Sequence, residues 1–139
     1  MRLKILVIVF IAASSLSMAI AAEKQEPQNL ILKEMIPLDN AFKETIDAIV
    51  LNQPERIAPA FEDVHKVRAE VEDAVKKGAE IRLPKNQKRF REFVRLDDKF
   101  HIELETLLHA AKGRDMRVVQ RQTHKLLDFC VRCHAIFRR

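Results

Sequence analysis

The chain has 139 residues, with 25 Lys and Arg against 20 Asp and Glu and a formal net charge of +5. This length allows one small domain with a single core, and two glycines, five prolines and no Trp or Tyr are typical of a helical protein with few turns. Arg2 and Lys4 belong to the N-terminal segment described next. The rest of the chain has 23 basic and 20 acidic residues, so its charge does not predict nucleic-acid binding.

The first 22 residues have the three parts of an export signal. Residues 1–4 are basic, residues 5–11 are an unbroken apolar run, and Ala19-Ile20-Ala21 fits the rule for a cleavage site. Residues 5–22 are about long enough for a marginal membrane span, but their second half is small and weakly apolar. We therefore expect cleavage after Ala21 or Ala22, export to a bacterial periplasm, and a mature domain of residues 23–139 without stable membrane insertion.

A first helix is predicted from about Asn29 to Leu51. Its apolar positions recur every three or four residues. They are Ile31, Met35, Leu38, Phe42, Thr45 or Ile46, and Ile49. Pro37 lies within this stretch and predicts either a kink or a helix start just before it.

A second helix is predicted to end near Lys77, just before Gly78. Asn52, Pro54 and Glu55 indicate its start, with Asn52 as the N-cap. Its apolar stripe consists of Ile57, Phe61, Val64, Val71 and Val75, and Arg68 interrupts it.

Two further helices are predicted after a connection over residues 79–86. The third covers residues 87–112 and ends at Gly113, and the fourth is capped by Asp115 and carries the C-terminus. Asp97 lies on the apolar stripe of the third helix, where it can pair with Arg68 in the interior or lie exposed at the end of the fold. Four amphipathic helices without a strand signal predict an all-α, antiparallel four-helix bundle.

The fourth helix ends with Cys130-Val131-Arg132-Cys133-His134, and these are the only two cysteines of the chain. Two thiols at this spacing can add to the two vinyl groups of one haem, and the adjacent imidazole can then bind the iron. The motif predicts one covalent haem c on the C-terminal helix, with Cys130 and Cys133 as attachment points and His134 as an iron ligand.

Three other uses of two cysteines are less well supported. A thioredoxin-like dithiol requires a βαβ context, and no strand pattern lies near the motif. A zinc site requires four ligands, and no second ligand pair has zinc-finger spacing. A disulfide within one helical turn would be strained.

From Leu30 to Arg138 the chain resembles the class II cytochromes c, the cytochrome c-prime and cytochrome c556 family. The most specific part is Leu126 to Arg138, where C-x-x-C-H is followed by an aromatic residue and an arginine close to the C-terminus. The resemblance implies that Arg138 lies at the haem, where it can pair with a propionate. Many members form dimers through the first two helices, so it also implies a homodimer as one arrangement.

In this family a methionine early in the first helix is the sixth iron ligand of low-spin members, and Met35 matches it. High-spin members instead carry an apolar group that leaves the iron five-coordinate. Pro37 departs from the pattern, and Met35 could also be an ordinary core residue. His101, on the inward side of the third helix, is a competing ligand.

The resemblance implies an electron carrier without enzymatic activity, whose partners are redox proteins that dock at the haem edge. Arg132, Arg138, Arg139 and Lys125 near the motif favour an acidic partner surface. If the iron is five-coordinate, the alternative is a cytochrome c-prime that binds nitric oxide or carbon monoxide. A peroxidase is disfavoured, because the sequence shows no distal His and Arg pair.

Overall fold

The computed structural model of the protein describes residues 29–138. The predicted signal segment, residues 1–22, lies outside the described residues, as do residues 23–28 and Arg139. All regular structure in the described part is helical. Its elements are α1 (Leu30–Val50), the 3-10 turn η1 (Pro54–Arg56), α2 (Ile57–Ala60), α3 (Glu62–Lys76), the 3-10 turn η2 (Gln87–Arg89), α4 (Phe90–Lys112) and α5 (Met116–Phe137). The predicted all-α fold is confirmed for these residues.

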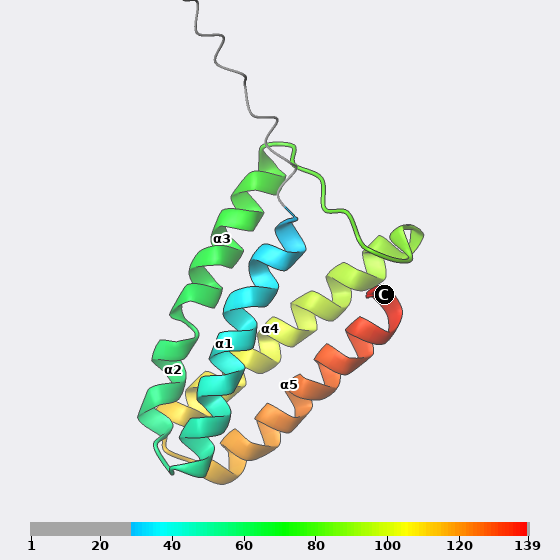
Figure 1. Ribbon diagram of the computed structural model, residues 1–139. Coiled ribbons are helices and arrows are strands. Elements are labelled where there is room, and N and C mark those ends of the chain that lie inside the picture. Colours follow the sequence, from blue (N-terminus) through cyan, green and yellow to red (C-terminus); the bar gives the residue numbers. More distant parts are fainter. Residues whose placement is uncertain (1–28, 139) are drawn as a thin grey trace, which may run out of the picture.

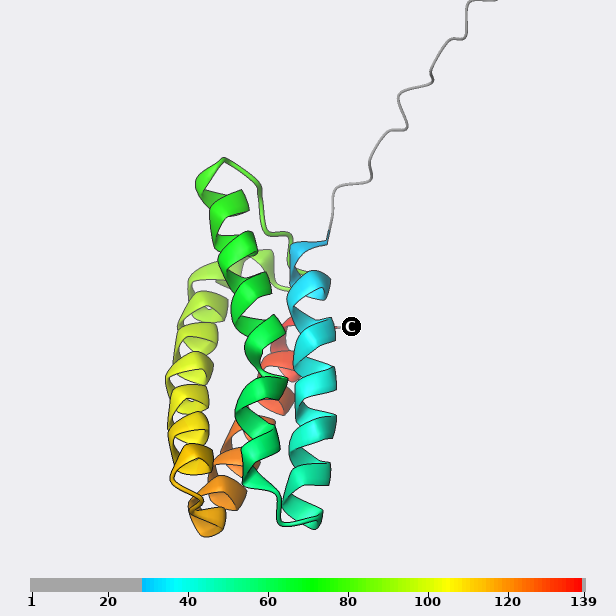
Figure 2. The same cartoon turned by 90° about the vertical axis from the view of Figure 1, so that its left-hand side faces the viewer.

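Four long helices, α1, α3, α4 and α5, form the body of residues 29–138 (Figure 1). α1 packs mainly on α3, and α4 packs mainly on α5, so the fold consists of two helix pairs. Seen from the side, α3 lies between α1 and α4, while α5 lies behind (Figure 2). The arrangement is a helical bundle, and it places the C-terminal end of α5 beside the start of α4.

The start of α1 shows that one of the two outcomes expected at Pro37 is wrong. The helix does not begin just before Pro37, because Asn29 already caps it, with Asn29 Oδ1 accepting a hydrogen bond of 3.2 Å from the Leu32 amide. Pro37 lies inside α1 and removes one backbone donor from the helix. Met35 therefore occupies the second turn of a continuous helix.

The second predicted helix differs from the structure in its start and in its continuity. Asn52 is not an N-cap: it has a left-handed φ of 53°, and Gln53 precedes η1 instead. The helix is interrupted at Phe61, where the Phe61 amide bonds to the Ala58 carbonyl instead of continuing the α-helical pattern. Pro59 has no amide hydrogen, so the short helix before Phe61 lacks one of its possible bonds.

Helix ends further along the chain agree with the predicted boundaries. Gly78 follows α3 with a φ of 97°, a conformation that glycine adopts at little cost. Asp115 caps α5, and its side chain accepts a 3.1 Å hydrogen bond from the Val118 amide. After α4 the left-handed residue is Arg114, with a φ of 57°, and not Gly113.

The bundle core is apolar and continuous between the helix pairs. Its largest fully buried side chains are Ile57, Phe61, Leu104, Leu107, Val119, Leu126 and the hydroxyl-bearing Thr45. The Thr45 hydroxyl donates a 2.8 Å hydrogen bond to the Ala41 carbonyl, so it is satisfied within α1. None of the helices described here is long and apolar enough to cross a membrane.

Candidate functional site

A cleft with a volume of about 730 Å³ opens between α1 and the C-terminal half of α5. This volume lies within the range of small-molecule and cofactor sites. Its walls are mostly apolar. They are formed by Asn29, Ile31, Leu32, Met35, Ile36, Leu38, Asp39 and Phe42 of the N-terminal side, by Leu83, Pro84 and Phe93, and by Leu127, Cys130, Cys133, His134, Phe137 and Arg138 of the C-terminal side.

The amphipathic pattern of α5 positions the C-x-x-C-H motif. Leu126 and Phe137 are buried in the core and fix the rotation of the helix. Cys130, Cys133 and His134 lie within little more than one turn, are half-buried, and all line the cleft. One wall of the cleft thus presents two thiols and an imidazole.

Both thiols are free, and burial makes them poor nucleophiles by themselves. Burial raises the pKa of the Cys130 thiol. Burial, with smaller effects from the charges of Asp97 and Cys130, raises the pKa of the Cys133 thiol to about 11. A reactive dithiol of the thioredoxin kind depends on a lowered thiol pKa, so the surroundings of this pair do not support that alternative.

The surroundings of His134 favour its neutral form, which is the form that binds metals. Burial, and secondarily the positive charge of Arg138, lower the pKa of His134, which favours the neutral imidazole. Arg138 is exposed at the end of α5, where its amide donates a 3.0 Å hydrogen bond to the His134 carbonyl. Arg138 also lines the cleft, and its charge acts on His134.

Met35 lines the cleft from α1, on the opposite wall from His134. Leu38 and Phe42 follow it along the same side of α1, and both pack in or against the core. The methionine is partly buried, so α1 contributes one soft sulfur donor to the cleft, while α5 contributes the imidazole nitrogen beside the two thiols.

The rival ligand His101 does not line the cleft. Its side chain is 16% exposed and its Nε2 lies 3.6 Å from Asp97 Oδ1. The zinc alternative finds no support either, because among residues 29–138 no three His, Cys, Asp or Glu side chains are grouped as a metal ion would require. The donors that line the cleft are the imidazole of His134, the sulfur atoms of Met35 and the two cysteines, and the carboxylate of the exposed Asp39.

A charged cluster between the helix pairs lies next to the cleft. Arg68 Nη1 lies 3.3 Å from Asp97 Oδ2 and Arg68 Nε lies 2.9 Å from Glu72 Oε1, so the predicted pair of Arg68 and Asp97 forms at a half-buried position. Burial raises the pKa of Glu34 to about 7, and the negative charges of Asp97 and Glu72 add to this effect while Arg68 opposes it.

We expect Glu34→Gln to stabilise the protein at pH 8 by about 1–2 kcal/mol. The raised pKa of Glu34 means that the folded state holds a proton more tightly than the unfolded state, so stability is lost as the pH rises from 4.5 through about 7. The neutral amide removes this loss above pH 7 and changes little at pH 4.5. Urea unfolding followed by circular dichroism at both pH values measures the effect.

Asp47→Asn is the matched control, because Asp47 is an exposed carboxylate on the same helix. A stability gain in Glu34→Gln that is equal at pH 4.5 and pH 8 would contradict the assignment of the pH dependence to Glu34.

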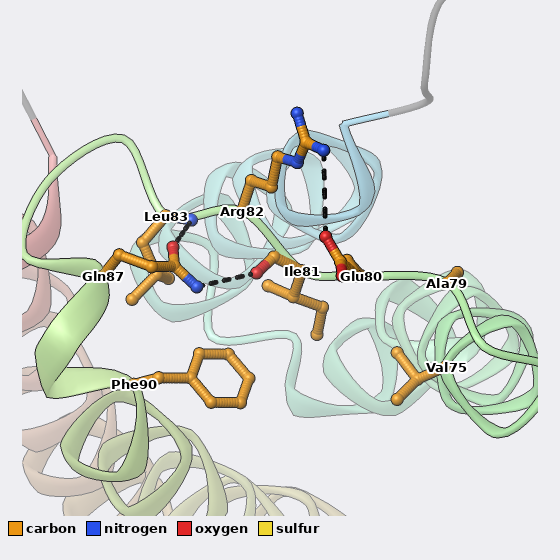
Figure 3. A pocket seen from close by; sticks show the side chains of 8 residues that line it. All are labelled: Val75, Ala79, Glu80, Ile81, Arg82, Leu83, Gln87 and Phe90. Atoms are coloured by element: carbon orange, nitrogen blue, oxygen red, sulfur yellow. Dashed lines mark hydrogen bonds and ion pairs between the residues drawn. The ribbon is translucent and has the colours of Figure 1, made fainter.

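The connection between α3 and α4 was not predicted as part of the site, but it lines one end of the cleft. Leu83, in this connection, is only 8% exposed and lines the cleft together with Pro84. The Gln87 side chain holds it: Oε1 accepts a 2.7 Å hydrogen bond from the Leu83 amide, and Nε2 donates a 3.2 Å bond to the Ile81 carbonyl (Figure 3). A second, more open hollow of about 630 Å³ lies on the other side of Leu83.

A hydrogen bond also joins the connection to the end of α5. Asn86 has a left-handed φ of 58°, and its side-chain amide donates a 2.6 Å hydrogen bond to the Ile136 carbonyl. Ile136 lies in the last turn of α5, just beyond the motif. Asn86 was predicted to end the connection and Gln87 to begin the third helix, whereas the structure places Gln87 in η2, ahead of α4. Polar side chains at such positions are normally solvated, so no local signal distinguished either residue.

We expect Gln87→Ala to loosen this wall without unfolding the bundle. Loss of the bonds to Leu83 and Ile81 lowers stability by about 1 kcal/mol and speeds hydrogen exchange of the Leu83 amide by roughly tenfold. Amide exchange measured by nuclear magnetic resonance tests this. Gln120→Ala, an exposed glutamine of α5, is the control, and an unchanged Leu83 exchange rate in Gln87→Ala would show that the side-chain bond does not fix the connection.

Comparisons with known proteins give no further guide to this site. No protein-family model, no curated protein and no solved structure matches this chain. The assignment of the cleft therefore depends on its own residues.

Proposed function

We propose that the protein is an exported, single-haem cytochrome of the class II type that carries electrons, with His134 and Met35 as the two axial ligands of the iron. One observation carries the proposal. The only two cysteines of the chain, the histidine that follows them and Met35 all line one apolar cleft, and they do so from two facing helices.

The residues of the cleft suit covalent attachment. Each thiol can add to a vinyl group so that sulfur binds one carbon and the thiol hydrogen goes to the other, a step that needs no oxidant. Haem of this kind is attached outside the cytoplasm, which agrees with the export signal expected in residues 1–22. Because Cys130 and Cys133 line the same cleft, both would be available to hold one haem.

The same residues suit electron transfer. A haem c bound in the cleft would supply an iron that alternates between the ferric and the ferrous state. His134 offers a neutral imidazole, and Met35 offers a thioether that favours the reduced state. Leu38, Phe42 and Phe93 give the space between the two walls an apolar lining.

We propose no catalytic activity, since the lining of the cleft offers no second histidine for acid–base chemistry beside His134. If His134 and Met35 both bind the iron, no coordination site would remain for a substrate. The partners would then be redox proteins.

Optical spectra of the purified protein, oxidised, reduced and reduced under carbon monoxide, test the proposal. Split, narrow low-spin bands that do not respond to carbon monoxide are expected. Broad high-spin bands that shift with carbon monoxide would reject Met35 as a ligand and favour the gas-binding cytochrome c-prime. A protein without haem absorption would reject the proposal as a whole.

A further inference from the structure

Exposed charge is segregated between the two helix pairs. On α1 and α3, seven exposed side chains are acidic and three are basic, whereas on α4 and α5 eight are basic and three are acidic. The two pairs form opposite sides of the bundle (Figures 1 and 2). Among the four long helices of residues 29–138, the side formed by α1 and α3 is therefore mostly acidic, and the side formed by α4 and α5 is mostly basic.

The basic residues form rows along the two antiparallel helices. Arg91, Arg95 and Lys99 recur every four residues on α4, and Arg121 and Lys125 do so on α5, with Arg132 two turns further along. We call these six residues the basic face. Like charges four residues apart destabilise a helix, so neither helix gains stability from this arrangement.

Five of these six cations form no ion pair within the described part of the protein. Lys125 Nζ lies 2.6 Å from Glu103 Oε1, but the other five form no ion pair with a carboxylate of residues 29–138. Four of the five are arginines, whose planar guanidinium can bind a carboxylate through two hydrogen bonds. Their positive charge remains available to an external anion.

We propose that the basic face is the docking surface for an acidic face of a redox partner protein. The inference rests on the proposed function only for the redox nature of the partner. Arg132 lies between Cys130 and Cys133, so a partner seated there contacts the helical segment that carries both thiols. The exposed acids Asp98 and Asp128 lie on the same helices. A protein surface can match both signs, whereas an anionic membrane presents only one.

Poly-L-glutamate, used as a protein-like acidic probe, tests the face without reference to haem. We expect Arg95→Gln/Arg132→Gln to weaken binding at low salt by about tenfold. Lys66→Gln/Lys76→Gln, which removes two exposed charges from α3, is the matched control and should weaken it less than twofold. Equal losses in both variants would mean that binding follows net charge, and this would overturn the proposal.

Two further measurements test whether the partner is a redox protein and whether it is a protein or a membrane. Ferricyanide, an anion that takes one electron from the reduced protein and becomes ferrocyanide, should react more slowly with Arg95→Gln/Arg132→Gln than with the control variant. An unchanged rate beside lost poly-L-glutamate binding would overturn the redox role of the face. Tighter binding to phosphatidylglycerol vesicles than to poly-L-glutamate at equal charge concentration would overturn the choice of a protein partner.

Discussion

Replacing Cys130 and Cys133 together by alanine is expected to abolish haem retention in denaturing electrophoresis, from one haem per chain to none. Only covalently bound haem survives that treatment, and the chain has no other cysteine. The imidazole of His134 and the sulfur of Met35 would remain, so the variant can still bind haem reversibly in its native state. Haem staining of the gel, with the spectrum of the native protein beside it, separates attachment from binding.

Replacing each cysteine separately tests whether one thiol is enough to retain haem. Cys130→Ala or Cys133→Ala leaves one thiol at the cleft, so each should retain haem through one thioether bond. Val131→Ala is the control, because Val131 lies between the two cysteines but is 68% exposed and does not line the cleft. Haem retained by the double variant would contradict attachment through these thiols.

Replacing Met35 by leucine is expected to open the sixth coordination position of the iron. Leucine keeps the apolar volume of the side chain at a cost below about 1.5 kcal/mol and removes only the sulfur donor. The spectrum should change from low spin to high spin, and carbon monoxide binding to the reduced protein should rise from none to stoichiometric. Met35→Ala should have the same effect on the spectrum with a larger loss of stability.

Met116→Leu is the matched control for this experiment. Met116 packs against the same core but begins α5 and does not line the cleft. Its replacement should leave the spectrum and the response to carbon monoxide unchanged. A low-spin spectrum in Met35→Leu would show that another group, and not Met35, fills the sixth position.

Local signals of the chain predicted the helices well where a single residue decides the geometry. Asp115 caps α5 and Gly78 follows α3 as expected, since a capping carboxylate and a left-handed glycine act on their own neighbours. The prediction was wrong at Asn52, which adopts the left-handed conformation after α1 instead of capping the next helix. Asparagine is favoured in both roles, so its identity alone could not distinguish them.

The candidate site was only partly visible in the sequence. The C-x-x-C-H motif is local, and its spacing and the apolar stripe of α5 place its three reactive side chains on one side of the helix. The sequence offered both Met35 and His101 as partners for that side. The packing of α1 against α5 brings Met35 to the cleft, whereas His101 lies outside its lining beside Asp97.

The sequence by itself determined that residues 29–138 are helical and that two thiols and an imidazole lie together near the end of α5. Both follow from the spacing of residues within single helices. The tertiary structure decided which distant residues complete the site. Leu83 lines the cleft from a connection that is bonded through Gln87 to its own backbone and through Asn86 to the Ile136 carbonyl. Burial between helix pairs likewise raises the pKa of Glu34. Contacts between segments far apart in the chain depend on how helices pack, and periodicity within one helix does not encode them.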